Sequence, residues 1–235
     1  MNLSQAASLL QARKYKRYFQ LSNTEKTGPC FDLPPSLSCP VQSEICKGCY
    51  GKRGHYGAQG PLLLRLNNWV LLHTEGFQAW TSWMEGELNK LFWGSHGGFF
   101  RFHSTGDVFS IDYWKAILEI VEGYPEVQFW LPTHNYKLMR IAARETGLPN
   151  NLTVGLSHVK GTKHGQRAQA AYRYIKKLNP SAHVIFHYVF RSTQDLPDGV
   201  WVCPSIGRHK EYHSCREANC HRCFLGTDHI AFRWH

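Results

Sequence analysis

Residues 127–156 have the sequence VQFWLPTHNYKLMRIAARETGLPNNLTVGL, which predicts a strand, a helix and a second strand in succession. The apolar runs at 127–131 and 152–156 are short and bounded by turn-forming residues, as expected of buried strands. Residues 136–146 between them are predicted to form a helix that ends at Gly147. Because strands joined by a helix usually run parallel, this segment predicts a βαβ unit.

The same alternation of strands and helices extends over most of the chain. Further strands are predicted at 99–103, 184–190 and 200–203, and further helices at 3–20, at 62–92 with a break near Gly76, from a cap at Ser110 or Asp112 to Val121, and at 167–178. The predicted fold class is therefore α/β, a complete or partial parallel βα barrel with a cysteine-rich C-terminal appendage. In a βα barrel the loops that follow the strands carry the chemistry.

Three parts of the chain are expected to differ in structure. Residues 1–27 contain a basic helix, and residues 28–200 form the barrel-like domain with a long cysteine-bearing loop at 30–60. Residues 201–235 form a metal-binding appendage rather than an independent domain.

Composition narrows the class of protein. The chain has 235 residues, of which 43% are hydrophobic, so it can bury a core and is not expected to be disordered. The formal net charge of +10 favours anionic partners. No apolar run is long enough to span a membrane and the first residues lack the pattern of a secretory signal, so a cytoplasmic location is predicted. Cysteines stay reduced there, which makes metal binding a better expectation than disulfides. Four disulfides would suit the eight cysteines if the chain were exported.

The first cysteine cluster is the segment CPVQSEICKGCY, with Cys39, Cys46 and Cys49. A C-x2-C turn places two thiolates on one metal ion or cluster, and thiolates select zinc, copper(I) or iron–sulfur clusters. A structural zinc ion wants four ligands, for which Cys30 and His55 are candidates. A 4Fe–4S cluster held by three cysteines would instead leave one iron open to a small molecule.

The second cysteine cluster lies near the end of the chain and consists of Cys203, Cys215, Cys220 and Cys223. The C-x4-C-x2-C run matches the spacing of plant-type ferredoxins, except that the fourth cysteine lies upstream. His209, His213 and His221 are additional candidate ligands. The set predicts a second iron–sulfur cluster or a structural zinc ion, with equal weight.

Polar residues follow three successive predicted strands. They are Ser104, Thr105, Gly106 and Asp107, then Thr133, His134 and Asn135, then Ser157 and His158. The turn at 104–107 can offer backbone N–H groups to a carboxylate, and Asp107 can accept from an amino group or a ribose hydroxyl. For any single one of these residues helix capping is the better explanation, but the set favours a site at the barrel mouth. Arg101, His103 and His187 lie in or beside strands, where a lone histidine is more often a hydrogen-bonded core residue.

Residues 155–180 form a basic stretch with six lysines and arginines and no acidic residue. Its loop at 160–165 leads into a helix and could contact the phosphates of a nucleotide or nucleic acid. A solvated helix face is an equally good interpretation.

These motifs together resemble a known family. In chain order they are Cys39, Cys46, Cys49 and Tyr50, then Arg101-Phe102-His103 with Gly106-Asp107, then Phe129-Trp130, then the terminal cysteines and His235. The pattern resembles the phage "gene product 88" family over roughly residues 28–235. The C-x6-C-x2-C-Y element is also similar to that of phage proteins grouped near the radical SAM enzymes. The resemblance places the protein in the cytoplasm of an infected host.

Kinship with radical SAM enzymes implies specific roles. Cys39, Cys46 and Cys49 would hold a 4Fe–4S cluster whose open iron binds S-adenosylmethionine, and the Ser104–Asp107 turn would lie at the cofactor. Electron transfer would cleave the sulfonium to a 5′-deoxyadenosyl radical, and the terminal cysteines would hold an auxiliary cluster. The first gap is six residues instead of the usual three, Tyr50 follows the last cysteine instead of preceding it, and no Gly-Gly-Glu motif occurs.

The predicted function is an iron–sulfur enzyme of the radical SAM type, with a nucleotide or nucleic acid as its expected substrate on charge alone. The alternative is a non-enzymatic, zinc-stabilised protein that binds nucleic acid through the basic stretch.

Overall fold

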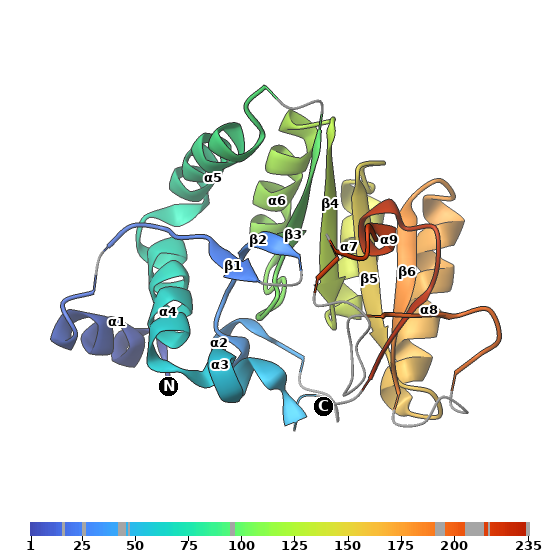
Figure 1. Ribbon diagram of the computed structural model, residues 1–235, viewed down its shortest axis with the longest axis horizontal. Coiled ribbons are helices and arrows are strands. Elements are labelled where there is room, and N and C mark those ends of the chain that lie inside the picture. Colours follow the sequence, from blue (N-terminus) through green and yellow to red (C-terminus); the bar gives the residue numbers. More distant parts are fainter. Residues whose placement is uncertain are drawn as a thin grey trace.

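The computed structural model describes residues 1–15, 17–24, 27–41, 46, 48–94, 97–190, 196–204, 214–215 and 217–233. At its centre is an eight-stranded sheet with the order β1-β2-β3-β4-β5-β6-β8-β7 (Figure 1). The strands are β1 (Ser22–Thr24), β2 (Gly28–Phe31), β3 (Gly98–Phe102), β4 (Val127–Thr133), β5 (Leu152–His158), β6 (His183–Phe190), β7 (Trp201–Val202) and β8 (Ile230–Arg233). Strand β1 pairs with β2 antiparallel, and every other neighbouring pair is parallel.

The mixed α/β class and the parallel sheet are confirmed, whereas the complete barrel is wrong. Among the described residues the sheet is open, with β1 and β7 at its two edges. Strand β1 has three residues and runs antiparallel to its neighbour, and β7 has two residues. Such short outer strands cannot supply the continuous ladder that closure of a barrel requires.

The helices that the sequence predicted are present, but the first ends at Ala12 and not at residue 20, and three short helices of four residues each were not predicted. The helices are α1 (Leu3–Ala12), α2 (Pro35–Ser38), α3 (Gly54–Gly57), α4 (Gln59–Thr74), α5 (Gly76–Phe92), α6 (Ile111–Gly123), α7 (Tyr136–Glu145), α8 (Lys163–Leu178) and α9 (Arg222–Leu225), with a 3-10 turn η2 (Tyr50–Lys52). Helix α8 begins four residues earlier than predicted because the Thr162 side chain accepts a hydrogen bond from the backbone of Gly165 and caps it. None of the described helices is long and apolar enough to cross a lipid bilayer.

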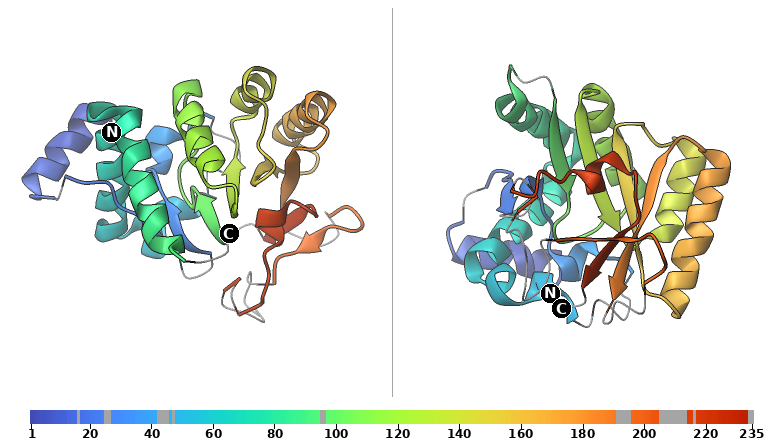
Figure 2. Two further views of the ribbon diagram at one scale, coloured as in Figure 1. Left: turned by 90° about the horizontal axis from the view of Figure 1, so that it is seen from above. Right: turned by 45° about the vertical axis from the view of Figure 1, so that its right-hand side comes forward.

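The two faces of the sheet are covered by different parts of the chain. Helices α6, α7 and α8 lie side by side against one face, and the C-terminal segment with α9 lies across the other (Figure 1, Figure 2). On the helical face, Phe100, Phe102 and Phe129 pack into the main hydrophobic core. On the opposite face, Phe224 of α9 packs against Trp130 with ring centroids 5.6 Å apart.

The cysteine-rich C-terminal segment is therefore built into the sheet. Its strand β8 inserts between β6 and β7 and pairs with both. The hydroxyl of Thr153 on β5 donates to the carbonyl of Phe224 at 2.7 Å, which ties α9 to the centre of the sheet. Residues 201–233 contribute two strands and a covering helix as well as cysteines.

A glycine on β5 makes room for a histidine of the neighbouring strand. A Cβ atom at Gly155 would lie 1.8 Å from the Cε1 atom of His187, on β6. The side chain at this position must therefore be hydrogen for the imidazole ring to cross over β5.

We expect Gly155→Ala to lower the free energy of unfolding by about 1–3 kcal/mol, because the His187 ring or the backbone must move. Urea denaturation would measure this change. Gly86→Ala in α5 is the matched control, because a Cβ atom there meets no atom within 4 Å; that variant should be neutral or more stable by up to about 1 kcal/mol. Equal effects of the two substitutions would contradict the steric role of Gly155.

Candidate functional site

The predicted turn at 104–107 follows β3 directly, and an acidic residue that follows β2 is bound to it. One carboxylate oxygen of Asp32 accepts hydrogen bonds from the backbone nitrogens of Ser104, at 2.6 Å, and Thr105, at 3.0 Å. Its other oxygen accepts from the Ser104 hydroxyl. The sequence predicted that these amides could bind the carboxylate of a cofactor, whereas those of Ser104 and Thr105 are bonded to a carboxylate of the chain itself. Sequence reasoning missed Asp32, although its position directly after a buried strand was a usable signal.

Asp107 joins the end of β3 to the end of β4. It is 1% exposed, and it accepts hydrogen bonds from the Thr133 hydroxyl at 2.6 Å, the Val108 backbone at 2.8 Å and the His134 backbone at 2.9 Å. Burial raises the pKa of Asp107 from 3.8 to about 6, against the lowering effect of these bonds. The predicted polar residues after β3 and β4 therefore lie together. Direct contact between Asp107 and a cofactor stays a prediction.

A network of aromatic and histidine side chains lies at the ends of β4 and β5. The Tyr136 hydroxyl bonds to the Ser157 carbonyl and to Nε2 of His164, and Nδ1 of His134 is 3.1 Å from that same nitrogen. Burial lowers the pKa of His134 to about 3 and that of His164 to about 4, so both are neutral at pH 7. Sequence reasoning included His134 and Ser157 but missed Tyr136 and His164, which begin α7 and α8.

The other histidines near the strand ends are core residues. His158 is buried between the rings of Phe186 and Tyr188 on the helical face, and, after burial and Arg167, it contributes to the lowered pKa of His164. Nε2 of His103 lies 2.9 Å from the hydroxyl of Tyr113. Among the described residues, neither ring nitrogen of His158 and only one of His103 has a hydrogen-bond partner.

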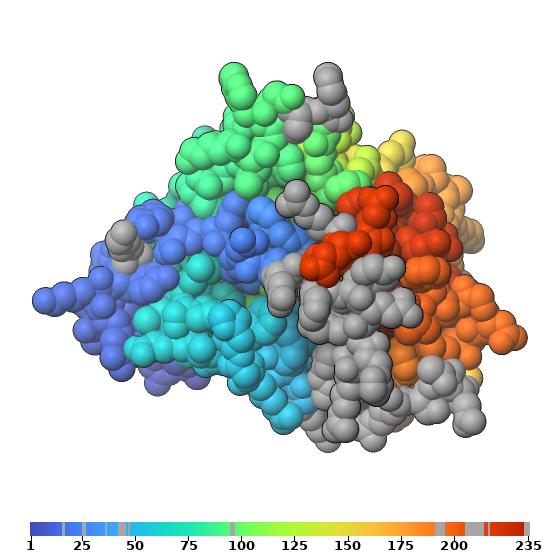
Figure 3. All heavy atoms as spheres, viewed as in Figure 1, coloured from blue at the N-terminus to red at the C-terminus, as the bar shows by residue number. Residues whose placement is uncertain are grey.

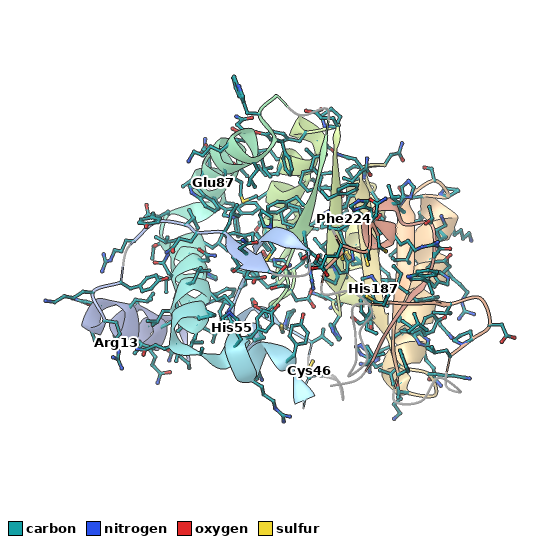
Figure 4. The ribbon with its side chains drawn as sticks, viewed as in Figure 1. Arg13, Cys46, His55, Glu87, His187 and Phe224 are labelled. Carbon is teal, nitrogen blue, oxygen red and sulfur yellow. The ribbon has the colours of Figure 1, made fainter. Side chains whose placement is uncertain are left out.

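The first cysteine cluster lies at this same edge of the sheet. Burial raises the pKa of Cys39, and the nearby charges of Asp107, Cys46 and Cys49 raise it further. Burial, with Asp107 and Cys46, likewise raises the pKa of Tyr136. The backbone nitrogen of Cys49 donates to the carbonyl of Cys46 at 3.2 Å, which is the turn expected for C-x2-C. Figure 4 shows Cys46 beyond the ends of the central strands. The thiols of the first cysteine cluster therefore lie near Asp107 and Tyr136.

A buried arginine holds the cysteine loop against the 104–107 turn. Arg65 of α4 is 1% exposed, and its Nη1 atom donates to the Gly51 carbonyl at 3.0 Å and to the Thr105 hydroxyl at 3.1 Å. Its Nη2 atom donates to the Tyr56 carbonyl and its Nε atom to Pro61, at 2.8 Å. The signal for Arg65 was a lone cation in the apolar run LLLRL, which sequence reasoning did not use.

The second cysteine cluster lies on the face of the sheet that α9 covers. Burial and then the charges of Cys203 and Cys215 raise the pKa of Cys223, with a further contribution from Cys220. The backbone of Cys203 donates to Ala231 of β8 at 3.0 Å, and that of Cys220 to Cys215 at 2.9 Å. The four predicted ligands are therefore near one another. No disulfide joins any of the eight cysteines, all of which lie in the described part of the chain.

No three His, Cys, Asp or Glu side chains are arranged to hold a single metal ion within the part of the chain that the structure describes. The candidate ligands His209 and His213, and the motif residue His235, lie outside the described residues. Metal binding by either cysteine cluster is therefore a prediction that the structure leaves untested.

Cations of the preceding helix, α7, lie beside the basic stretch at 155–180. Lys137, Arg140 and Arg144 of α7, with Ile141 and Tyr174, line a small cavity of about 140 Å³. The guanidinium of Arg140 lies 4.6 Å from the centre of the Tyr174 ring. This basic groove faces away from the cysteines, on the outer side of the helical layer.

A family model described as gene product 88 matches residues 1–227. The chain belongs to the gene product 88 family. No curated protein and no solved structure matches it. In this member of the gene product 88 family, the match includes both cysteine clusters, the 104–107 turn and helix α1. Kinship with radical SAM enzymes stays a prediction.

We expect the Asp32 contact to dominate the stability of this site. Asp32→Ala leaves the donors of Ser104 and Thr105 unpaired in a buried position, so the free energy of unfolding should fall by about 3 kcal/mol or more. Asp228→Ala is the control, because its ion pair with Arg222 is partly exposed and should be worth less than about 1 kcal/mol. Similar losses in both variants, measured by urea denaturation, would refute the special role of Asp32.

We also expect acid to destabilise the protein from about pH 6.5 downward. Burial lowers the pKa of His103, His134 and His187 to about 3 and that of His164 to about 4, so the unfolded chain binds protons that the folded chain refuses. Asp107 has the opposite effect, because its raised pKa stabilises the folded state as the pH falls through 6. It is a single group, however, and the four histidines together outweigh it.

The free energy of unfolding should therefore be lower at pH 5 than at pH 7, by an amount on the order of several kcal/mol. Urea titrations at the two pH values would measure it. Asp107→Asn should make the loss steeper by removing the opposing contribution. Equal stability at pH 5 and pH 7 would show that these histidines are not held neutral.

Proposed function

We propose that this protein is an iron–sulfur enzyme of the radical SAM type, built on a partial βα-barrel scaffold. One observation carries the proposal. The loop after the first parallel strand, β2, places Cys39, Cys46 and Cys49 beside Asp107 and Tyr136, where the following strands end. In βα architectures this edge is where the chemistry takes place.

The donor set fits an iron–sulfur cluster better than a closed zinc site. Thiolates are the ligands that such clusters require, and here the charges of Cys46 and Cys49 both act on Cys39. The other nearby thiol, Cys30, lies within β2 opposite Arg101, and its pKa is raised by burial and by Asp32 instead. A set of three leaves one iron open, which supports S-adenosylmethionine as the second cofactor.

The residues of the chain would have distinct tasks at such a site. When bound, the reduced cluster would supply the electron that cleaves S-adenosylmethionine to a 5′-deoxyadenosyl radical. The Ser104–Asp107 turn would form the wall against which the cofactor lies, and Asp107 would hold the ends of β3 and β4 in register. Tyr136, bonded to His164, would occupy the side of the site nearest Cys46 and keep that edge closed to water.

The second cysteine cluster would hold a second iron–sulfur cluster or a zinc ion. Support comes from the mutual proximity of its four thiols around Cys223. Such a site would pin α9 and the turn at 214–220 onto the sheet.

The basic groove of α7 and α8 favours a second candidate function, a zinc-stabilised protein that binds nucleic acid. Three cations and one aromatic ring line this groove, with no acidic residue among the lining side chains. The same groove would serve an enzyme whose substrate is a nucleotide or a nucleic acid.

We expect anaerobically purified protein to contain iron and sulfide, with broad absorbance near ~400 nm. Cys46→Ala should remove the iron of the first cluster and leave the metal of the terminal cysteines in place. Cys30→Ala is the matched control, because it removes a buried thiol from the same region without touching the proposed ligands. Zinc in stoichiometric amount without sulfide would favour the second candidate function, and loss of all metal from Cys46→Ala would indicate one composite site.

A further inference from the structure

Arg101 of β3 lies between the two cysteine clusters. Its neighbours across the sheet are Cys30 on β2 and Trp130 on β4. Its charge lowers the pKa of Tyr50, the residue after Cys49, on one side and that of Cys223 on the other, although burial raises both pKa values overall. On the face that Figure 3 shows, the segment near residue 50 lies to the left and the C-terminal segment lies to the right. Arg101 is thus the cation common to both clusters.

The guanidinium of Arg101 has more donors than acceptors around it. Its Nε atom donates to the His103 carbonyl at 3.3 Å, which is the one hydrogen bond it makes with the described residues. No carboxylate in the described part of the chain lies within ion-pair distance of it. Asp32 is close enough to raise its pKa, but the Asp32 oxygens are bonded to Ser104 and Thr105. A guanidinium carries five N–H donors, so four are left for another partner.

A rigid platform sets the direction of the guanidinium. The central carbon of the Arg101 guanidinium lies 4.3 Å from the centre of the Trp130 ring, which is a cation–π contact. The indole nitrogen of Trp130 donates to Nε2 of His187 at 3.2 Å, so His187 must carry its own proton on Nδ1. Figure 4 shows His187 near Phe224 on this same face. Gly155 gives His187 its space, and the arginine fork is therefore held in one orientation.

We propose that Arg101 is an anion-binding residue that receives a carboxylate or phosphate group of a substrate or cofactor between the two cysteine clusters. The N–H donors of this half-buried guanidinium that lack an acceptor have no compensation for the water they have lost. A bidentate anion supplies that compensation, and the planar fork matches the geometry of carboxylate and phosphate. The inference rests on the contacts of Arg101 alone and requires no metal.

Calorimetric titration of the full-length, anaerobically purified protein with inorganic phosphate and, separately, with acetate tests this site. Saturable binding of one of them is expected, and which one binds identifies the group. Arg101→Gln should weaken that binding by about tenfold or more, and Arg101→Lys should weaken it less, because lysine keeps the charge and loses the fork. Arg13→Gln is the control, since Arg13 is exposed at the end of α1 and lies far from His187 and Phe224 in Figure 4, and it should bind as the wild type does.

A second measurement uses the wild-type chain and so does not depend on the folding of a variant. Phenylglyoxal modifies arginine, and mass spectrometry locates the product. The bound anion should slow modification of Arg101 and leave that of Arg13 unchanged. Absence of saturable binding by both anions, unchanged affinity in Arg101→Gln, or no protection of Arg101 would each overturn the proposal. Iron analysis of the same preparation is a separate readout, so failure of the anion site and failure of the iron–sulfur proposal are distinguishable.

Discussion

The carboxylate of Asp32 accepts three hydrogen bonds from Ser104 and Thr105, and the candidate site depends on this contact. It joins the residue after β2 to the turn after β3, which are 72 residues apart along the chain. Arg65 then joins the same turn to the cysteine loop through Thr105 and Gly51. Because each of these groups is buried, an unpaired donor or acceptor would be costly, and the loop has one favoured position over the strand ends.

The sheet is used differently on its two faces. The helical face is a continuous apolar core, whereas the opposite face carries Arg101, Trp130 and His187 beneath the C-terminal segment. A closed barrel would enclose this polar face with strands. In the open sheet it is enclosed by the segment that bears the second cysteine cluster. Any metal bound by those cysteines would therefore also fix the cover over Arg101.

The iron–sulfur and anion-site proposals complement each other. One concerns thiols at the edge of the sheet, and the other concerns a cation on its face. Arg101 is close enough for its charge to act on Tyr50, beside Cys49, and on Cys223. The zinc alternative assigns no task to an arginine in this place.

Local pattern was enough to predict the longer helices, most strands and the C-x2-C turn, because apolar spacing and turn residues report on neighbours close in the chain. It also indicated that polar residues such as Asp107 and Thr133 would meet where parallel strands end. Only the tertiary structure decided that the sheet stays open, that β8 inserts between β6 and β7, and that Asp32, Arg65 and Tyr136 belong to the site. These features depend on hydrogen bonds between residues far apart in the chain, and a long-range polar contact leaves no periodic signal in the sequence around either partner.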